Sequence, residues 1–344
     1  MSGAQLSDFL DQLADRSELT RVSVEVDRRF ELAAIVQRAV NENSGSALLF
    51  ENVAGSSIPV VAGLLGTERR LLQALNVGTI DEVADRITAL VRPDLPEGML
   101  EALRMVPRVV EVTHWPPQTT TTALAQQVVH MGSDVDLGSL PVPVCWPGES
   151  LPALTSALLI IEEPIVESIG ETAAADSEKA RSVVQGSAHR KRRVVSRVPV
   201  QILDRNTLLI RWTPHDESWR VVSEAIATGH QLSIAIALGG DPVLTLAASA
   251  PLPPYVDRLT FAGFLRQSNV ALASGRSIET QVPADAEFIL ECLVNPERAF
   301  ADAPPVATAT GFLSGTEQAV VATVSAITHR ANPVLPVIVP GRSL

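Results

Sequence analysis

Residues Ala237–Pro253 read ALGGDPVLTLAASAPLP and carry a clear local signal. The apolar run that leads into them, Leu232–Ala237, is typical of a buried strand, and two glycines permit a tight turn after it. Asp241 followed by Pro242 is typical of a helix N-cap and its first-turn proline. The pattern predicts a strand, a tight turn and a short helix. That helix ends in the small residues Ala248-Ser249-Ala250-Pro251, which allow close backbone approach.

The sequence on both sides of this unit is rich in strands and poor in helices, which predicts a barrel-like or α+β domain. Helices are expected near Trp219–Thr228 and Asp257–Leu265. Further strands are expected at Val109–Val112, Ala157–Ile161, Val194–Leu203, Thr207–Trp212, Arg276–Val282, Glu287–Val294 and Ala319–Ile327.

The first hundred residues differ in the order of their predicted elements: helices and strands alternate there, as in an α/β unit. A first helix carries Leu6, Phe9, Leu10 and Leu13 and could be capped by Ser7, and Val22, Val24 and Val26 alternate as in a half-buried strand. We therefore expect an N-terminal α/β domain over 1–108 and a second domain over 109–344, the latter with an acidic, exposed and poorly ordered insertion at 162–188. The remaining expected elements are a helix through Leu32–Ala39, strands at Ala47–Phe50 and Val60–Leu64, and helices at Glu68–Leu75 and Ile80–Val91.

Length and charge narrow the class of protein. A chain of 344 residues fits two domains of about 150 residues each. With 39 acidic and 27 basic side chains, the net charge of −12 repels phosphate backbones and argues against nucleic-acid binding. The basic run Arg190–Arg193 is expected to be a solvated loop end. Cys145 and Cys292, expected to be buried small hydrophobes, fit a reducing compartment, and no signal peptide or membrane span is expected. These features predict a cytoplasmic protein.

Six segments carry a further signal: Ala47–Arg70, Gly132–Glu149, Arg205–Asp216, Ala237–Pro253, Val282–Glu291 and Ile327–Leu344. Together, and in order along nearly the whole chain, they resemble the UbiD family of decarboxylases that use prenylated FMN. The resemblance implies an N-terminal α/β domain and a central split-barrel domain that binds flavin. It also implies a C-terminal oligomerisation domain, which we expect to be absent here. Apolar surface around Asn332–Pro340 would then need another cover, from a homo-oligomer or from a full-length UbiD-type catalytic subunit.

The family's chemistry implies prenylated FMN with a divalent metal, a catalytic arginine and two catalytic glutamates. The position of the metal-binding asparagine is Val194, that of the catalytic arginine is Pro199, and that of the metal-binding glutamate is Arg258. The metal-binding histidine is retained as His215. Arg197 lies two residues before Pro199 and shares its strand face by alternation. Most of the groups that hold the metal and bind the carboxylate are therefore replaced.

The glutamate pair is also replaced. Asp302 is the acid nearest to the first position, and the second falls at Ala307 or Thr308. Asp302 is thus the sole weak catalytic candidate. The resemblance leaves these cofactor-binding candidates: Thr155, His215, Ala248, Ser249, Ala250, Pro251 and Arg258.

Each of these residues also has a purely structural interpretation. His215 is either a metal ligand or a surface or capping histidine, and Thr155 and Ser249 either contact a ligand or satisfy backbone groups. Glu287 and Glu291 alternate onto one strand face, and the family pattern marks them as structural.

The retained and replaced residues leave two candidate functions for the chain. The chain is a UbiD-like homologue that has lost catalysis and serves as a subunit, scaffold or ligand-binding module, with or without a cofactor. Alternatively, it is a divergent carboxy-lyase that decarboxylates an aromatic or unsaturated acid with prenylated FMN.

Overall fold

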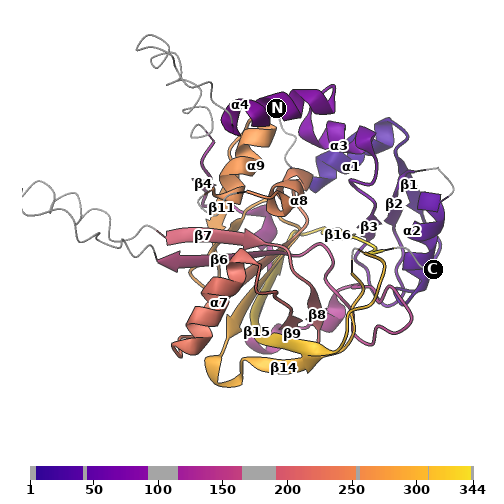
Figure 1. The fold of residues 1–344 in the computed structure, drawn as a ribbon. Coiled ribbons are helices and arrows are strands. Elements are labelled where there is room, and N and C mark those ends of the chain that lie inside the picture. Colours follow the sequence, from indigo (N-terminus) through magenta and orange to yellow (C-terminus); the bar gives the residue numbers. More distant parts are fainter. Residues whose placement is uncertain are drawn as a thin grey trace, which may run out of the picture.

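The computed structural model describes residues 5–41, 45–91, 115–164, 191–252, 256–308 and 310–341. This part of the chain forms an N-terminal sheet, a large central sheet and a small third sheet (Figure 1). Its helices are α1 (Leu6–Asp15), α2 (Glu31–Asn41), α3 (Glu68–Leu75), α4 (Ile80–Val91), α7 (Glu217–Ala227), α8 (Pro242–Ser249) and α9 (Arg258–Arg266). None of these helices is long and apolar enough to cross a membrane.

Most of the strands belong to the central sheet. In chain order, the first eight strands of the whole structure are β1 (Leu19–Val22), β2 (Ala47–Phe50), β3 (Val60–Ala62), β4 (Gln118–Thr119), β5 (Val128–Met131), β6 (Leu158–Pro164), β7 (Lys191–Ser196) and β8 (Val200–Ile202). The others are β9 (Thr207–Ile210), β10 (Leu232–Leu238), β11 (Ala271–Ser274), β12 (Gln281–Pro283), β13 (Phe288–Val294), β14 (Phe300–Ala303), β15 (Glu317–His329) and β16 (Leu335–Val337).

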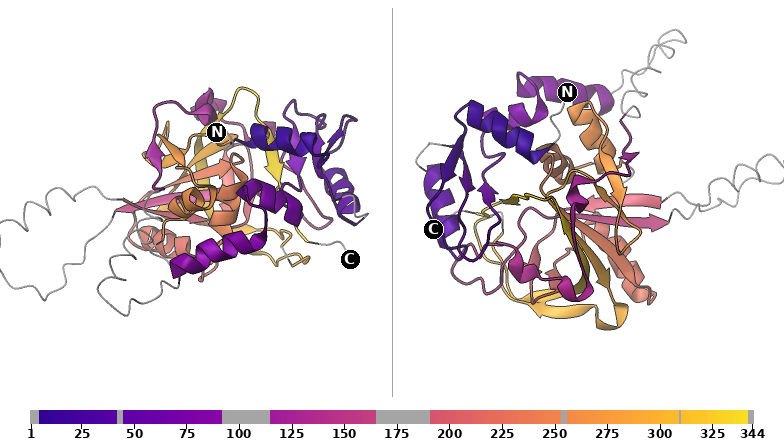
Figure 2. Two further views of the ribbon diagram at one scale, coloured as in Figure 1. Left: turned by 90° about the horizontal axis from the view of Figure 1, so that it is seen from above. Right: turned by 180° about the vertical axis from the view of Figure 1, so that it is seen from behind.

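The N-terminal sheet has the order β1-β2-β3-β16, so its last strand comes from the other end of the chain. β16 runs parallel to β3, with Leu335 opposite Val60 (Figures 1 and 2). The expectation of uncovered apolar surface over Asn332–Pro340 is therefore wrong for its centre. Leu335 and Val337 are 1% and 5% exposed, because they form a strand of this sheet, and only Ile338 beyond them is exposed.

The central sheet follows the path β7-β6-β10-β13-β15-β9-β8, with β14 and β5 paired to β15. Its two end strands, β7 and β8, are consecutive in the chain and are joined by residues 197–199 alone. The four residue steps from Ser196 to Val200 span at most about 14 Å, so the two ends of the sheet lie close together and the sheet must curl. We call this β7–β8 connection, Arg197-Val198-Pro199, the seam.

Both faces of β10 and β13, in the middle of the curled sheet, are largely buried, which explains why these strands read as continuous apolar runs. In β6, Leu159 and Ile161 face a core that also contains residues of α7 and of the N-terminal sheet. Leu158 and Ile160 point to the other face, which α8 and α9 cover (Figure 1). The strand–turn–helix unit predicted from the sequence is confirmed. Asp241 accepts a hydrogen bond from the backbone N–H of Val243 at the start of α8, and Gly239 and Gly240 both have positive φ.

Four local predictions need correction. The strand expected at Val194–Leu203 is broken at the seam into β7 and β8. Ser7 is no cap, because α1 begins at Leu6 after Gln5, whose side chain makes no capping bond. The strand through Val22–Val26 ends at Val22, and Val24 is exposed. The segment Arg276–Val282 is not one strand; its first residues form a loop around the carboxylate of Glu291.

The expected insertion, the strand at Val109–Val112 and the domain boundary lie largely or wholly outside the described residues. The insertion's first residues, Glu162 and Glu163, are instead part of β6 and pair with β7. The basic run is no solvated loop end where it is described, because Arg192 and Arg193 lie in β7. Arg192 pairs with Glu163 at 2.8 Å, and Arg193 pairs with Asp257 at 2.8 Å.

Glu287 is a buried carboxyl group between the central sheet and the segment leading to β16. Its Oε2 accepts a hydrogen bond from the backbone N–H of Val334 at 2.9 Å, and Arg330 lies 3.7 Å from Oε1. Burial raises the pKa of Glu287 from 4.5 to about 7, although the Val334 bond and Arg330 oppose the rise. Because the folded-state pKa is raised, the stability from this group is complete below pH 4.5 and is lost as the pH rises through 7.

We expect the substitution Glu287→Gln to remove that pH dependence. The free energy of unfolding of the native chain should fall by up to about 3 kcal/mol from this group between pH 5 and pH 8. The variant should match the native chain at pH 5 and exceed it at pH 8 in urea titrations. Glu297→Gln, at an exposed position, is the control. Parallel pH profiles for the native chain and Glu287→Gln would contradict this expectation.

Candidate functional site

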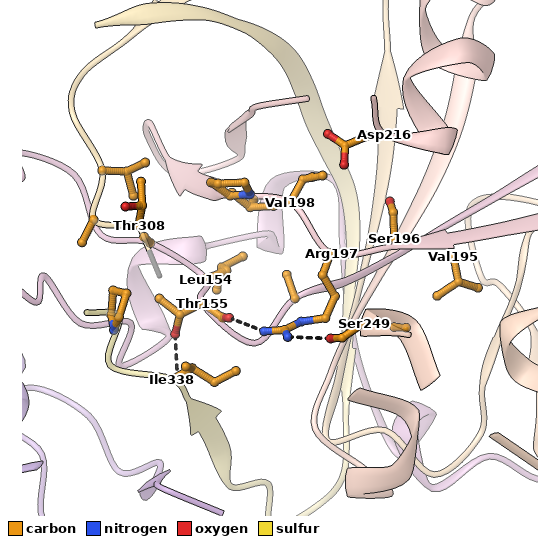
Figure 3. A pocket seen from close by; sticks show the side chains of 18 of the residues that line it. Leu154, Thr155, Val195, Ser196, Arg197, Val198, Asp216, Ser249, Thr308 and Ile338 are labelled. Atoms are coloured by element: carbon orange, nitrogen blue, oxygen red, sulfur yellow. Dashed lines mark hydrogen bonds between the residues drawn. The ribbon is translucent and has the colours of Figure 1, made fainter. Parts of the chain in front are cut away.

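A pocket of about 870 Å³ opens beside the seam, between β7, the start of α7 and the end of α8 (Figure 3). Its size lies within the range of small-molecule sites, and most of its lining is apolar. The polar lining comes from segments far apart in the sequence, which the curl of the central sheet brings together. These polar residues are Thr155, Ser196, Arg197, His215, Asp216, Glu217, Ser249, Arg258 and Thr308.

Arg197 lies in the seam and reaches between two other segments of the lining (Figure 3). Its Nη1 donates to Ser249 Oγ at 3.0 Å and its Nη2 donates to the carbonyl oxygen of Thr155 at 3.2 Å. Its Nε is buried and has no hydrogen-bond partner among the described residues. Burial lowers the pKa of the Arg197 guanidinium. A cation that is held by neutral oxygens and keeps an unmet donor can accept an anionic ligand.

The acidic side chains of the lining are already engaged. Glu217 accepts hydrogen bonds from Arg258 at 2.9 Å through Oε2 and from Arg192 through Oε1. Asp216 Oδ2 accepts from the backbone N–H of Thr213 at 2.6 Å and from its hydroxyl at 2.9 Å. Both carboxylates therefore hold the protein's own structure at the edge of the pocket.

Five of the seven cofactor-binding candidates come together here: Thr155, His215, Ala248, Ser249 and Arg258. Ala250 and Pro251 follow the end of α8, and the lining does not include them. The catalytic candidate Asp302 lies on β14, outside the lining, where its carboxylate accepts from the Gln318 amide. Thr155 Oγ1 accepts from the backbone N–H of Ile338 at 2.9 Å, and Ser249 Oγ donates to the carbonyl of Thr245 at 2.8 Å. Both hydroxyls thus serve the backbone as well as facing the pocket.

The residues present do not fit a divalent metal. Over the described ranges, no three His, Cys, Asp or Glu side chains converge as metal ligands. His215 is exposed, Arg258 is held by Glu217, and Val194 is buried in the apolar core while its neighbour Val195 lines the pocket. A guanidinium stays protonated and repels a divalent cation.

A flavin mononucleotide fits the pocket better than a metal does. The volume accommodates it, the apolar lining suits a flat ring system, and two arginines at the pocket keep buried Nε donors without partners in the described chain, namely Arg197 and Arg258. The family resemblance pointed to Thr155, Ser249 and Arg258. It did not point to Glu217, whose role depends on arginines from two other elements.

Two family models match the chain. The model of the 3-octaprenyl-4-hydroxybenzoate carboxy-lyase N-terminal domain (UbiD_N) matches residues 10–90. The model of the Rift-related domain of the same carboxy-lyase (UbiD) matches residues 179–343. Together they cover the helices and strands that form the N-terminal sheet and most of the central sheet.

Solved structures of UbiD-class enzymes share the fold. The enzyme HmfF from Pelotomaculum thermopropionicum, in complex with FMN, is 26% identical with a TM-score of 0.78, and the alignment covers 98% of this chain and 65% of that one. An evolved dimeric form of HmfF, in complex with prenylated FMN, is likewise 26% identical with a TM-score of 0.78, over 98% of this chain and 68% of that one. The vanillic acid decarboxylase of Sedimentibacter hydroxybenzoicus in open form is 20% identical with a TM-score of 0.76, over 99% and 64%. The chain thus spans about two thirds of the length of these relatives.

Proposed function

The chain belongs to the UbiD family, and from this premise we propose that its pocket binds a flavin mononucleotide while the chain itself no longer decarboxylates. One observation carries the proposal. A pocket of flavin size contains the cation Arg197 with an unmet donor, and every carboxylate in its described lining is already engaged. Such a pocket is suited to hold an anionic ligand and unsuited to move a proton.

The residues that would hold the flavin surround Arg197. Ser249 and Thr155 flank the guanidinium, and the apolar side chains of Val198, Leu252 and Ile338 offer surfaces for a ring. A prenylated flavin, when bound, supplies an electron sink for the carbanion left by departing CO2. This chain's own contribution is to bind and orient the cofactor and to exclude water from its apolar side.

The loss of catalysis is proposed from what replaces the family's reacting groups. Protonation of carbon needs a positioned acid. Ala307 and Thr308, at the position of the second glutamate, line the pocket, whereas Asp302 lies away from it on β14. Pro199, at the position of the catalytic arginine, has no cationic side chain. The chain would then act as a flavin-binding subunit or scaffold.

The alternative, a divergent carboxy-lyase that uses prenylated FMN, is favoured by one observation. Arg197 enters the pocket from the seam, two residues from Pro199, so a cation remains where a substrate carboxylate would need one. Release of CO2 by the loaded chain distinguishes the two functions.

The proposal extends to partners and domains. We propose that the curled sheet is a split barrel, that the chain divides near 108/109 with β16 returning to the first sheet, and that it works in the cytoplasm. Its partner would be a second copy or a full-length UbiD-type subunit. Phe312, Leu313 and Ile338 are exposed apolar residues available for such a contact. Light scattering of the chain alone and mixed with a full-length homologue tests this.

We expect FMN to bind the chain and to lose its fluorescence as its ring enters the pocket. Ala307→Phe should fill part of the half-buried lining and weaken FMN binding by about tenfold or more, equal to about 1.4 kcal/mol. Ala34→Phe, at an exposed position on α2, is the matched control. Equal affinity for FMN in the two variants, or no quenching of FMN or prenylated FMN by the native chain, would refute the proposal.

A further inference from the structure

We propose that the Arg197 guanidinium binds an oxyanion of the ligand directly, with no divalent metal between them. The inference rests on the proposed flavin pocket and goes beyond it, because it assigns the anion to one side chain and removes the metal from the site. The assignment comes from the contacts of Arg197 alone.

Arg197 differs from five buried or half-buried arginines that hold the fold together. Each of these five has a carboxylate partner, so its charge is balanced within the chain. Arg197 has none among the described residues, where its guanidinium contacts the Ser249 hydroxyl and the Thr155 carbonyl. The balanced pairs are Arg70–Glu18 at 3.1 Å, Arg193–Asp257 at 2.8 Å, Arg258–Glu217 at 2.9 Å, Arg266–Asp241 at 2.7 Å and Arg330–Glu287 at 3.7 Å.

An unbalanced cation at this depth is unfavourable without a counter-ion, because burial removes water from the charge. The lowered pKa of Arg197 has desolvation as its cause, with no acidic neighbour opposing it. A guanidinium carries five N–H donors in a planar fork. Two are used by Ser249 and Thr155, and the buried Nε–H has no partner in the described chain. Of the donors that remain, the Nη hydrogens are those that a carboxylate or phosphate in the pocket would meet, because the Nε atom itself is buried.

Two groups could supply that oxyanion, and both present the same pair of oxygens. One is the phosphate of the flavin mononucleotide, and the other is the carboxylate of an aromatic acid. The apolar residues beside the guanidinium, Val198 and Leu252 among them, suit the flat body of either molecule. The shared chemistry is an oxyanion attached to an apolar ring, and binding experiments separate the two sources.

The test compares FMN, riboflavin and benzoate in EDTA and in MnCl2, with flavin fluorescence and calorimetry as readouts. We expect FMN to bind equally well in EDTA and in Mn²⁺. Arg197→Met should weaken its binding roughly 10- to 100-fold, as expected for loss of a charged hydrogen-bond donor. The FMN affinity of Arg197→Lys should lie between those of the native chain and Arg197→Met, because lysine keeps the positive charge but lacks the planar fork of donors. Riboflavin, which lacks the phosphate, should bind weakly to all three proteins.

The control is Arg205→Met. Within the described ranges, the Arg205 side chain also bonds only to carbonyl oxygens, those of Val135 and Ser133, but it is exposed and lies outside the pocket. Melting curves establish that each variant is folded. If FMN and riboflavin bind alike while benzoate binding depends on Arg197, the oxyanion is a carboxylate. If benzoate binding depends on Arg197 and neither flavin binds, the flavin proposal fails and this inference stands.

Two results would overturn the inference itself. One is FMN binding that appears only when Mn²⁺ is added, which would place a metal between protein and phosphate. The other is an equal effect of Arg197→Met and Arg205→Met on every probe, including the case in which the native chain binds none of them. Either result would leave Arg197 as a structural link between the seam and α8.

Discussion

Loaded with prenylated FMN and supplied with Mn²⁺, this chain is expected to release CO2 from aromatic and unsaturated acids no faster than a heat-denatured sample. The expected loss is large, because a positioned acid alone contributes roughly 10²- to 10⁴-fold to a proton-transfer rate. In the described lining, Glu217 is bound by two arginines and Asp216 by Thr213, so neither offers a free acid. The measurement is CO2 release over a panel of acids.

Restoring a single one of the family's catalytic groups should also fail to produce decarboxylation. Thr308→Glu places a carboxylate on the lining but leaves Pro199 without a cation, and groups that act as a unit do not restore activity one at a time. Ala34→Glu is the matched control on the exposed face of α2. Turnover by the native chain that exceeds the denatured sample and is lost on substitution of His215 or Asp302 would establish the carboxy-lyase instead.

Replacing Glu291 by alanine is expected to lower the free energy of unfolding by at least about 4 kcal/mol. This carboxylate is fully buried and accepts hydrogen bonds from the loop between β11 and β12. It accepts from the backbone N–H of Arg276 at 2.6 Å, from that of Ile278 at 3.1 Å and from both donors of Ser277. Each buried donor left without an acceptor costs about 1–3 kcal/mol.

Urea titration of Glu291→Ala, beside Glu297→Ala at an exposed site, measures this effect. The control should change stability by less than about 0.5 kcal/mol, as surface substitutions do. Faster amide hydrogen exchange at 276–278 in the Glu291 variant would place the loss at the loop. A difference of under 1 kcal/mol between the two variants would show that the loop does not depend on this carboxylate.

The elements predicted correctly are those whose signals are local. The β10–α8 unit contains its own turn glycines and its own cap, and α3 spans Glu68–Leu75 as its apolar spacing predicts. The β16–β3 pairing has no such signal, since a three-residue apolar run does not indicate its partner. The segment Arg276–Val282 was predicted as one strand because alternation says nothing about a carboxylate fifteen residues later that binds its amides.

The prediction of the candidate site was limited in the same way, because only local sequence signals could be used. Residue types and spacing indicated which family groups are replaced, and His215, Thr155, Ser249 and Arg258 do share one pocket. Strand alternation placed Arg197 on the face of Pro199. It could not show that the strand breaks there, or that the guanidinium meets no carboxylate in the described chain. Charge balance depends on neighbours from several elements, which only the folded arrangement brings together.

The order of synthesis makes β16 a late component of an early sheet. β3 ends at Ala62, and its parallel neighbour begins at Leu335, 273 residues later (335 minus 62). At roughly 5–20 residues per second, a ribosome needs about 14–55 s to make the intervening chain. During that interval the edge of β3 has unpaired backbone groups beside apolar side chains that are buried in the folded chain. Such an edge can pair with strands of other nascent chains. The β3 edge is therefore a place where chaperones would protect the nascent chain during translation.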